Sequence, residues 1–266
     1  MIDVSSYPEG RIDEMRTPLK WDDITGEMPT IINRKKELAR KLGVPAVLFT
    51  QQEVRARIES MALYELLHGH PDSNVYVGLL NGAMPFIGQF FPQMAKHDPT
   101  HHPLVRTMVV SRYEADQEGH KILKIVNDLD EEVLIKARKI TIVDEVGDMG
   151  DTVRDTRLHL HNRFKRLTDT NNLSFGLRLL TDKGIADYQK IGFDLDNVMI
   201  GATVPVAWIS GMGMDGANET YRWWPEITLS PVQDEKYREA MPEILDVLGE
   251  RALFGMDDFT WVVPKT

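Results

Sequence analysis

The stretch ITIVDEVGDMGDTV, residues Ile140 to Val153, decides the fold. It begins with apolar and β-branched residues, which predict a buried strand. Two adjacent acids, Asp144 and Glu145, stand where that strand ends, and a third acid, Asp148, opens the turn DMGDT before a helix. Because ligands of open α/β sheets bind at the carboxyl ends of the strands, these acids predict a ligand at that edge.

The turn DMGDT has the features of an anion site. The first backbone N–H groups of a helix have no partner within it, and the helix dipole favours a negative charge there. Gly150 permits the tight turn, and Thr152 offers a hydroxyl. The acids would repel a bare anion, but they would accept hydrogen bonds from the hydroxyls of a phosphorylated sugar, directly or through Mg²⁺. The stretch therefore predicts such a sugar as the ligand, the alternative being a surface turn with incidental acids.

Strands and helices alternate on both sides of this stretch. Thr50 and Glu53 match a capping box before residues at helical spacing, which predicts a helix that ends at Gly69. Further helices are predicted at 85–95 and 151–164, and at 34–43 and 234–250 in the polar ends. Strands are predicted at 75–80, 106–113, 121–126, 139–145, 173–180, 197–202 and 204–210. This order predicts a parallel α/β sheet covered on both faces.

The composition excludes several classes of protein. A formal net charge of −10 over 266 residues argues against a surface that neutralises nucleic-acid phosphates. Cysteine is absent, which excludes a disulfide framework and a thiolate metal site. The sequence has neither a long apolar run nor the apolar core of a signal peptide near its start. We therefore expect a cytoplasmic location, with no nucleic-acid or membrane partner.

The motif resembles the phosphoribosyl-pyrophosphate signature of the type I phosphoribosyltransferases. That signature is an apolar strand, two acids, two apolar residues, Asp, a small residue, Gly, any residue and Thr. The chain fits it at Asp144, Glu145, Asp148, Gly150 and Thr152. The resemblance implies the fold of that family: a central, mostly parallel sheet flanked by helices, with a C-terminal hood and a mobile lid loop.

The order of the elements is similar to that of the hypoxanthine-guanine branch. VGLLNGAMPFIGQF resembles its pyrophosphate loop, and RLLTDK and VPVAWISGMGMDGANETYRWWPEI resemble its purine-site strand and C-terminal loop. The similarity implies a phosphoribosyltransferase domain at 47–230, between an N-terminal extension, 1–46, and a C-terminal helical extension, 231–266.

The resemblance implies roles for single residues around phosphoribosyl pyrophosphate. Asp148 is the expected catalytic base, which takes a proton from the imidazole nitrogen of the purine. Asp144 and Glu145 are expected to hold the ribose hydroxyls. The residues expected to contact the 5′-phosphate are Met149, Gly150, Asp151 and Thr152. Asn81 and Gly82 are expected to contact the pyrophosphate through a non-proline cis peptide. Tyr113 is expected to belong to the lid.

The resemblance also implies a purine site and a metal site. Lys183 is expected to donate to the 6-oxo group, Trp208 to stack on the base, and the backbone carbonyl of Ile209 to read the base edge. Asp215 is expected near the base and the metal. The implied cofactor is Mg²⁺, held by Asp144, Glu145 and Asp215.

Three positions depart from the family pattern. Met149 stands where Thr or Ser is usual, Asp151 adds a negative charge beside the phosphate, and Asn81 replaces a basic residue. We expect an enzyme that transfers 5-phosphoribose to hypoxanthine or guanine, forms IMP or GMP, and assembles as a homodimer or homotetramer. The alternatives are an enzyme for xanthine or another heterocycle, or a regulator that binds phosphoribosyl pyrophosphate without catalysis.

Overall fold

The computed structural model describes residues 15–20, 46–68, 74–111, 123–134, 137–165, 173–184, 186–204, 208–215 and 222–229. These residues fall into two compact units. The first unit takes those within 1–19 and 55–203, and the second takes those within 20–54 and 204–266. Within these described segments, no helix is both long and apolar enough to span a bilayer.

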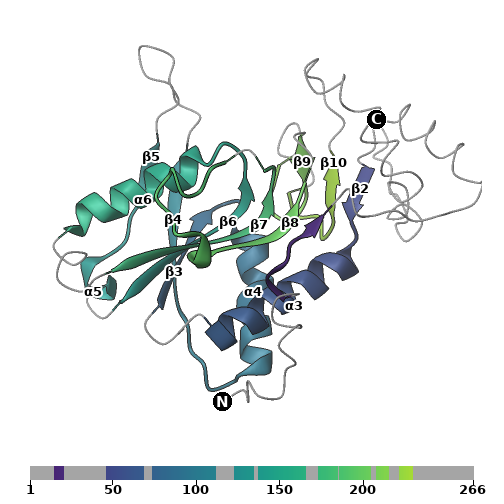
Figure 1. Ribbon diagram of the computed structural model, residues 1–266, viewed down its shortest axis with the longest axis horizontal. Helices are drawn as coiled ribbons and strands as arrows, with labels where there is room; N and C mark the ends of the chain where they lie inside the picture. Colours follow the sequence, from purple (N-terminus) through teal and green to yellow (C-terminus); the bar gives the residue numbers. More distant parts are fainter. Residues whose placement is uncertain are drawn as a thin grey trace, which may run out of the picture. The chain divides into compact units, whose positions relative to one another are not determined.

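A seven-stranded sheet in the order β1-β8-β7-β6-β3-β4-β5 organises the first unit (Figure 1). The pairs β8–β7, β7–β6, β6–β3 and β3–β4 are parallel, and β5 pairs antiparallel to β4. The predicted, mostly parallel α/β sheet is thereby confirmed. The strands are β1 (Leu19–Lys20), β3 (Asn74–Leu80), β4 (Leu104–Ser111), β5 (Lys124–Asn127), β6 (Lys139–Gly147), β7 (Ser174–Asp182) and β8 (Val198–Thr203).

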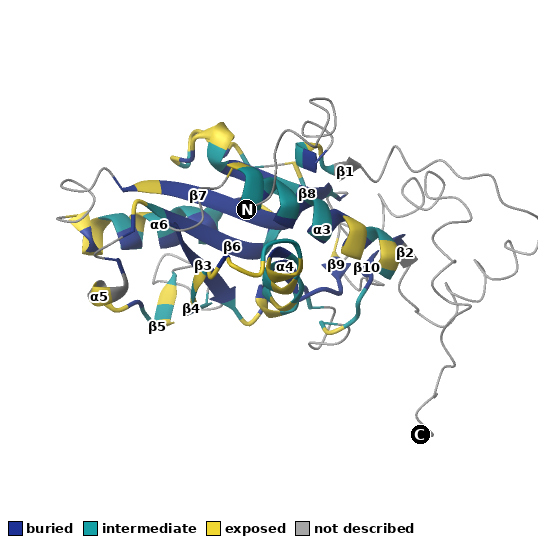
Figure 2. Cartoon of the chain, turned by 90° about the horizontal axis from the view of Figure 1, so that it is seen from below, coloured by how far each residue is buried: buried dark blue, intermediate teal, exposed yellow. Residues whose placement is uncertain are grey.

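Helices cover both faces of this sheet. Tyr76 of β3 contacts α3 (Gln51–His68) through Glu65 and α4 (Met84–His97) through Phe91, so both helices lie on its face. Its neighbours Val75 and Val77 point to the opposite face, where they share a core with α6 (Asp151–Arg163). The central strands are accordingly buried along most of their length (Figure 2). Two short helices, α5 (Glu131–Leu134) and η3 (Leu195–Asn197), complete the unit.

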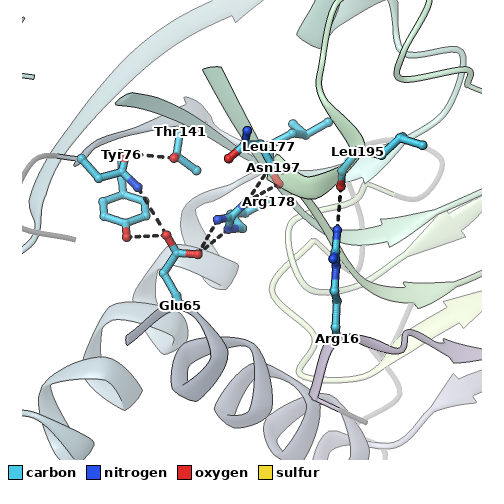
Figure 3. A network of polar contacts seen from close by, with 9 residues as sticks. Arg16, Glu65, Tyr76, Thr141, Leu177, Arg178, Leu195 and Asn197 are labelled. Atoms are coloured by element: carbon cyan, nitrogen blue, oxygen red, sulfur yellow. Dashed lines mark hydrogen bonds and ion pairs between the residues drawn. The ribbon is translucent and has the colours of Figure 1, made fainter. Parts of the chain in front are cut away.

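A buried polar network ties α3 to the sheet (Figure 3). Glu65 accepts hydrogen bonds from the Tyr76 hydroxyl at 2.8 Å and from Arg178 Nε at 2.7 Å. Burial acts to raise the pKa of Glu65, but the Arg178 charge and the Tyr76 hydroxyl outweigh it and hold that pKa below its usual value. Both charges are almost wholly buried, so the loss of either would leave its partner uncompensated in the core.

The connections on either side of the sheet's centre run in opposite directions. β3 and β6 are neighbours, but α4 leads from β3 to β4 on one side, whereas α6 leads from β6 to β7 on the other. The carboxyl ends of β3 and β6 therefore form a topological switch point, which is where α/β sheets bind ligands.

β6 and β7 reach further than their sequence predicts. β6 continues past both acids to Gly147, and β7 continues to Asp182.

The capping box is confirmed, because Thr50 N–H donates to Glu53 Oε2 at 2.9 Å and Glu53 N–H donates to Thr50 Oγ1 at 3.4 Å.

The second unit contains a small antiparallel sheet in the order β2-β10-β9, with β2 at Ala46–Phe49, β10 at Ile227–Leu229 and β9 at Ile209–Ser210. Only the last two residues of the strand predicted at 204–210 form β9, and 205–207 lie outside the described residues. The helices predicted at 34–43 and 234–250 also lie outside them. Sequence patterns did not predict β2 or β10, which are too short for a periodic signal.

Candidate active site

The loop after β3 and the acid pair of β6 lie against each other. The Leu80–Asn81 peptide bond is cis, as the resemblance predicts, and Gly82 follows it. A Cβ atom on Gly82 would overlap the carboxyl carbon and both carboxylate oxygens of Glu145. Only glycine leaves room for that carboxylate, so two motifs that are far apart in the sequence form one site.

The two acids of β6 are held close together in a largely buried place. Asp144 is 7% exposed, and its Oδ1 accepts the Glu145 N–H at 3.0 Å. Burial, and then the neighbouring Glu145 charge, raise the pKa of Asp144 well above its usual range. Glu145 Oε2 is buried and has no hydrogen-bond partner among the described residues. Sugar hydroxyls or a cation would supply the partners that this acid pair lacks.

The turn between β6 and α6 ends at Gly150, the residue before the helix. Gly150 has φ of 77° and precedes the first residue of α6, and no side chain caps the helix. A Cβ atom there would lie 2.9 Å from Ala186 and 2.9 Å from Ile191, so the positive φ and the lack of space both require glycine. The N–H groups of the first turn therefore remain available for an anion.

Asp151 and Met149 are the two residues of this turn that depart from the family pattern. The carboxylate of Asp151 pairs with Arg154 at 2.7 Å, and the same guanidinium pairs with Asp155 at 2.8 Å, so the cation offsets part of the charge of Asp151. Met149 is 60% exposed.

Asp148 and Lys183 meet across the ends of β6 and β7. Lys183 Nζ lies 3.2 Å from Asp148 Oδ2, and the Lys183 N–H donates to the Gly147 carbonyl at 2.9 Å. The Lys183 side chain is 10% exposed, whereas that of Asp148 is 53% exposed. The expected base and the expected purine donor are thus adjacent, one as an acceptor and the other as a donor.

Sequence reasoning missed two residues next to this pair. Tyr188 Oη donates to Asp182 Oδ1 at 2.5 Å, and both side chains are buried. Asp182 directly precedes Lys183 at the end of a predicted strand, which is a signal for a site residue. Tyr188 carries no such signal, because only the folded turn brings it back to the strand end.

The remaining predicted residues divide between the second unit and undescribed segments. In the second unit, Trp208 Nε1 donates to the Asp215 carbonyl at 2.8 Å, and the Asp215 carboxylate pairs with Arg222 at 2.5 Å. The Trp208 side chain is 43% exposed, so it is not a core residue, while Ile209 lies buried in β9. Tyr113, the residue expected in the lid, lies outside the described residues. Among the described residues, no three His, Asp or Glu side chains converge as a complete metal site.

The fold matches that of proteins of known structure. No protein-family model matches the chain. The hypoxanthine-guanine phosphoribosyltransferase of Lactococcus lactis is 23% identical over 184 residues, which are 69% of this chain and 90% of the relative. The hypoxanthine phosphoribosyltransferase of Staphylococcus aureus superposes with a TM-score of 0.53 at 20% identity, and the match covers 77% of this chain and 96% of the Staphylococcus chain. The hypoxanthine phosphoribosyltransferase of Trypanosoma cruzi superposes with a TM-score of 0.55 at 21% identity, and the match covers 75% of this chain and 97% of the Trypanosoma chain.

The chain has the phosphoribosyltransferase fold. The type I fold predicted from the motif is confirmed, as is the resemblance to the hypoxanthine-guanine branch. The chain covers 90% of the Lactococcus relative and 96% and 97% of the two superposed structures.

Proposed function

We propose that this chain is a purine salvage phosphoribosyltransferase. It transfers 5-phosphoribose from phosphoribosyl pyrophosphate to a 6-oxopurine, hypoxanthine or guanine, and releases pyrophosphate to form IMP or GMP. The observation that carries the proposal is the contact of Gly82 with the Glu145 carboxylate at the switch point, beside an uncapped helix N-terminus. The Lactococcus lactis relative is a hypoxanthine-guanine phosphoribosyltransferase, which supports the same reaction.

The sugar phosphate fits the ends of β6 and α6. Backbone N–H groups from Met149 to Thr152 bind the 5′-phosphate, and Gly150 supplies the required conformation. Asp144 and Glu145 accept hydrogen bonds from the ribose hydroxyls, which offsets the cost of burying two neighbouring acids. The backbone at Asn81 and Gly82 faces the pyrophosphate, and Tyr113 belongs to the lid that excludes water.

The base binds where a donor and an acceptor stand side by side. Asp148 accepts the proton that leaves the imidazole nitrogen, and Lys183 Nζ donates to the 6-oxo group. An exocyclic amino group in place of the oxygen would place a second hydrogen-bond donor opposite the Lys183 ammonium, so Lys183 selects a 6-oxopurine. The transition state carries positive charge on the ribose ring, and the carboxylates of β6 stabilise it. Trp208 stacks on the base, and the Ile209 carbonyl reads its edge.

The acid pair also fits Mg²⁺. Two carboxylates lie together, and within the described part of the chain one buried oxygen of Glu145 has no hydrogen-bond partner. Carboxylate oxygens are the ligands that a hard cation prefers. Asp144 and Glu145 would hold the ion, with Asp215 as a further ligand. Bound Mg²⁺ neutralises charge on the departing pyrophosphate. A cytoplasmic location and a homodimer or homotetramer belong to the same proposal and are supported by the resemblance.

The test is a panel of bases. The protein is incubated with phosphoribosyl pyrophosphate, Mg²⁺ and hypoxanthine, guanine, xanthine or adenine in turn, and nucleotide formation is followed by chromatography. The proposal predicts IMP or GMP and no AMP. Nucleotide from xanthine alone would favour the other acceptor, and binding of phosphoribosyl pyrophosphate without any product would favour a regulator.

A further inference from the structure

Two buried titratable side chains at the end of β7 have no part in the reaction as proposed. Asp182 is 5% exposed and Tyr188 is 6% exposed. Tyr188 Oη donates to Asp182 Oδ1 at 2.5 Å, and the Gly184 N–H donates to Asp182 Oδ2 at 3.0 Å. One carboxylate therefore joins the strand end to the turn that follows it.

This pair is packed against the backbone of β6. A Cβ atom on Gly147 would overlap the Tyr188 hydroxyl and would lie 2.7 Å from Asp182 Oδ1. The Gly147 carbonyl accepts the Lys183 N–H at 2.9 Å. Gly147 is thus held on two sides, and it directly precedes Asp148.

The same contacts also enclose Lys183. Asp182 precedes it, and the Gly184 N–H that Asp182 binds follows it, so both neighbours of Lys183 in the chain are fixed by one carboxylate. Burial, and then the hydrogen bond to Asp182, raise the pKa of Tyr188, so its hydroxyl stays a donor at physiological pH. Burial also raises the pKa of Asp182, and the nearby charge of Asp148 adds to this effect.

We propose that Asp182 and Tyr188 are positioning residues for base recognition. They touch neither substrate and act by fixing the positions of Gly147 and Gly184. The fixed backbone places the Asp148 and Lys183 side chains correctly for contact with the purine. The inference rests on the proposed function, which assigns both of those residues to the base. It implies that the pair affects kcat/KM for the base and has little effect on Kd for phosphoribosyl pyrophosphate.

Two variants test this from opposite sides. Tyr188→Phe removes the hydroxyl and keeps the ring, whereas Gly147→Ala adds a methyl group where that hydroxyl lies. Steady-state kinetics with each substrate varied, and calorimetry of phosphoribosyl pyrophosphate binding, separate the two substrates. We expect kcat/KM for the base to fall roughly tenfold or more, as for misplaced catalytic groups, with Kd for phosphoribosyl pyrophosphate within about twofold of wild type. Tyr64→Phe, the same deletion on α3, is the matched control and should match wild type.

Each result bears on the inference. Equal losses for both substrates, or wild-type kinetics in both variants, would overturn it. Retained binding of phosphoribosyl pyrophosphate shows that a variant is folded, and if one variant fails to fold, the other decides. A wild-type protein that makes no nucleotide from any base defeats the proposed function itself, and this inference with it, whereas an active wild type with unshifted variants defeats the inference alone.

Discussion

The substitution Gly82→Ala examines the contact that brings the two halves of the site together. The added methyl group would occupy the place of the Glu145 carboxylate. Gly82 is outside the left-handed region, so its backbone accepts alanine and the clash is the dominant effect. The flexible Glu145 side chain has to turn away, because the alternative is a shift of the β3 and β6 backbones in the core of the sheet.

The size of the effect follows from what Glu145 does in the proposed complex. A hydrogen bond to a charged group contributes about 1.5–3 kcal/mol. At 1.4 kcal/mol for each factor of ten, its loss weakens binding roughly 10- to 100-fold. We therefore expect Kd for phosphoribosyl pyrophosphate with Mg²⁺ to rise by that factor in Gly82→Ala, as measured by isothermal titration calorimetry.

Two comparisons isolate the cause. Gly88→Ala in α4 adds the same methyl group where, apart from its chain neighbours and its own helix backbone, no atom of the described residues lies within 4 Å. It should therefore bind like wild type and gain up to about 1 kcal/mol of helix stability. Glu145→Ala removes the displaced group itself, so adding Gly82→Ala to it should weaken binding little further. Wild-type affinity in Gly82→Ala, or additive losses in the double variant, would refute the reasoning.

Three further substitutions probe single roles. Asp148→Asn should lower kcat by about 10²-fold or more, the usual size of a general-base effect, and unchanged turnover in a steady-state assay would remove Asp148 from that role. Lys183→Ala should raise KM for the base roughly tenfold or more while KM for phosphoribosyl pyrophosphate stays constant, and equal changes would place Lys183 outside the purine pocket. Asp144→Asn should stabilise the protein without ligand. The raised pKa of Asp144 means that the folded state holds its proton more tightly, so wild-type stability falls as pH rises from about 4 through the raised value. The melting temperature of the Asp144→Asn variant should therefore exceed that of wild type by a margin that grows with pH, about 2–4 °C for each kcal/mol of unfolding free energy regained. A lower melting temperature of the variant at neutral pH would contradict this.

Local signals explain why the central motif was predictable. The apolar run of β6, Gly150 and the start of α6 are neighbours in the chain, and each has a direct conformational consequence. The pairing of Asp151 with Arg154, three residues on, was also readable from helical spacing.

Contacts between distant segments explain what the sequence could not reveal. Gly82 and Glu145 each belong to a recognisable motif, but their contact depends on β3 and β6 being neighbours in the sheet. Tyr188 reaches Asp182 only after the turn beyond β7 has folded back. The strands of the small sheet have two to four residues each, and their pairing across the chain leaves no periodic pattern.

The most direct measurement of the central claim is a crystal structure of the protein with phosphoribosyl pyrophosphate and Mg²⁺. The account predicts the 5′-phosphate on the backbone N–H groups between Asp148 and Thr152, with the ribose hydroxyls on Asp144 and Glu145. A ligand bound elsewhere, with this turn free of phosphate, would contradict it.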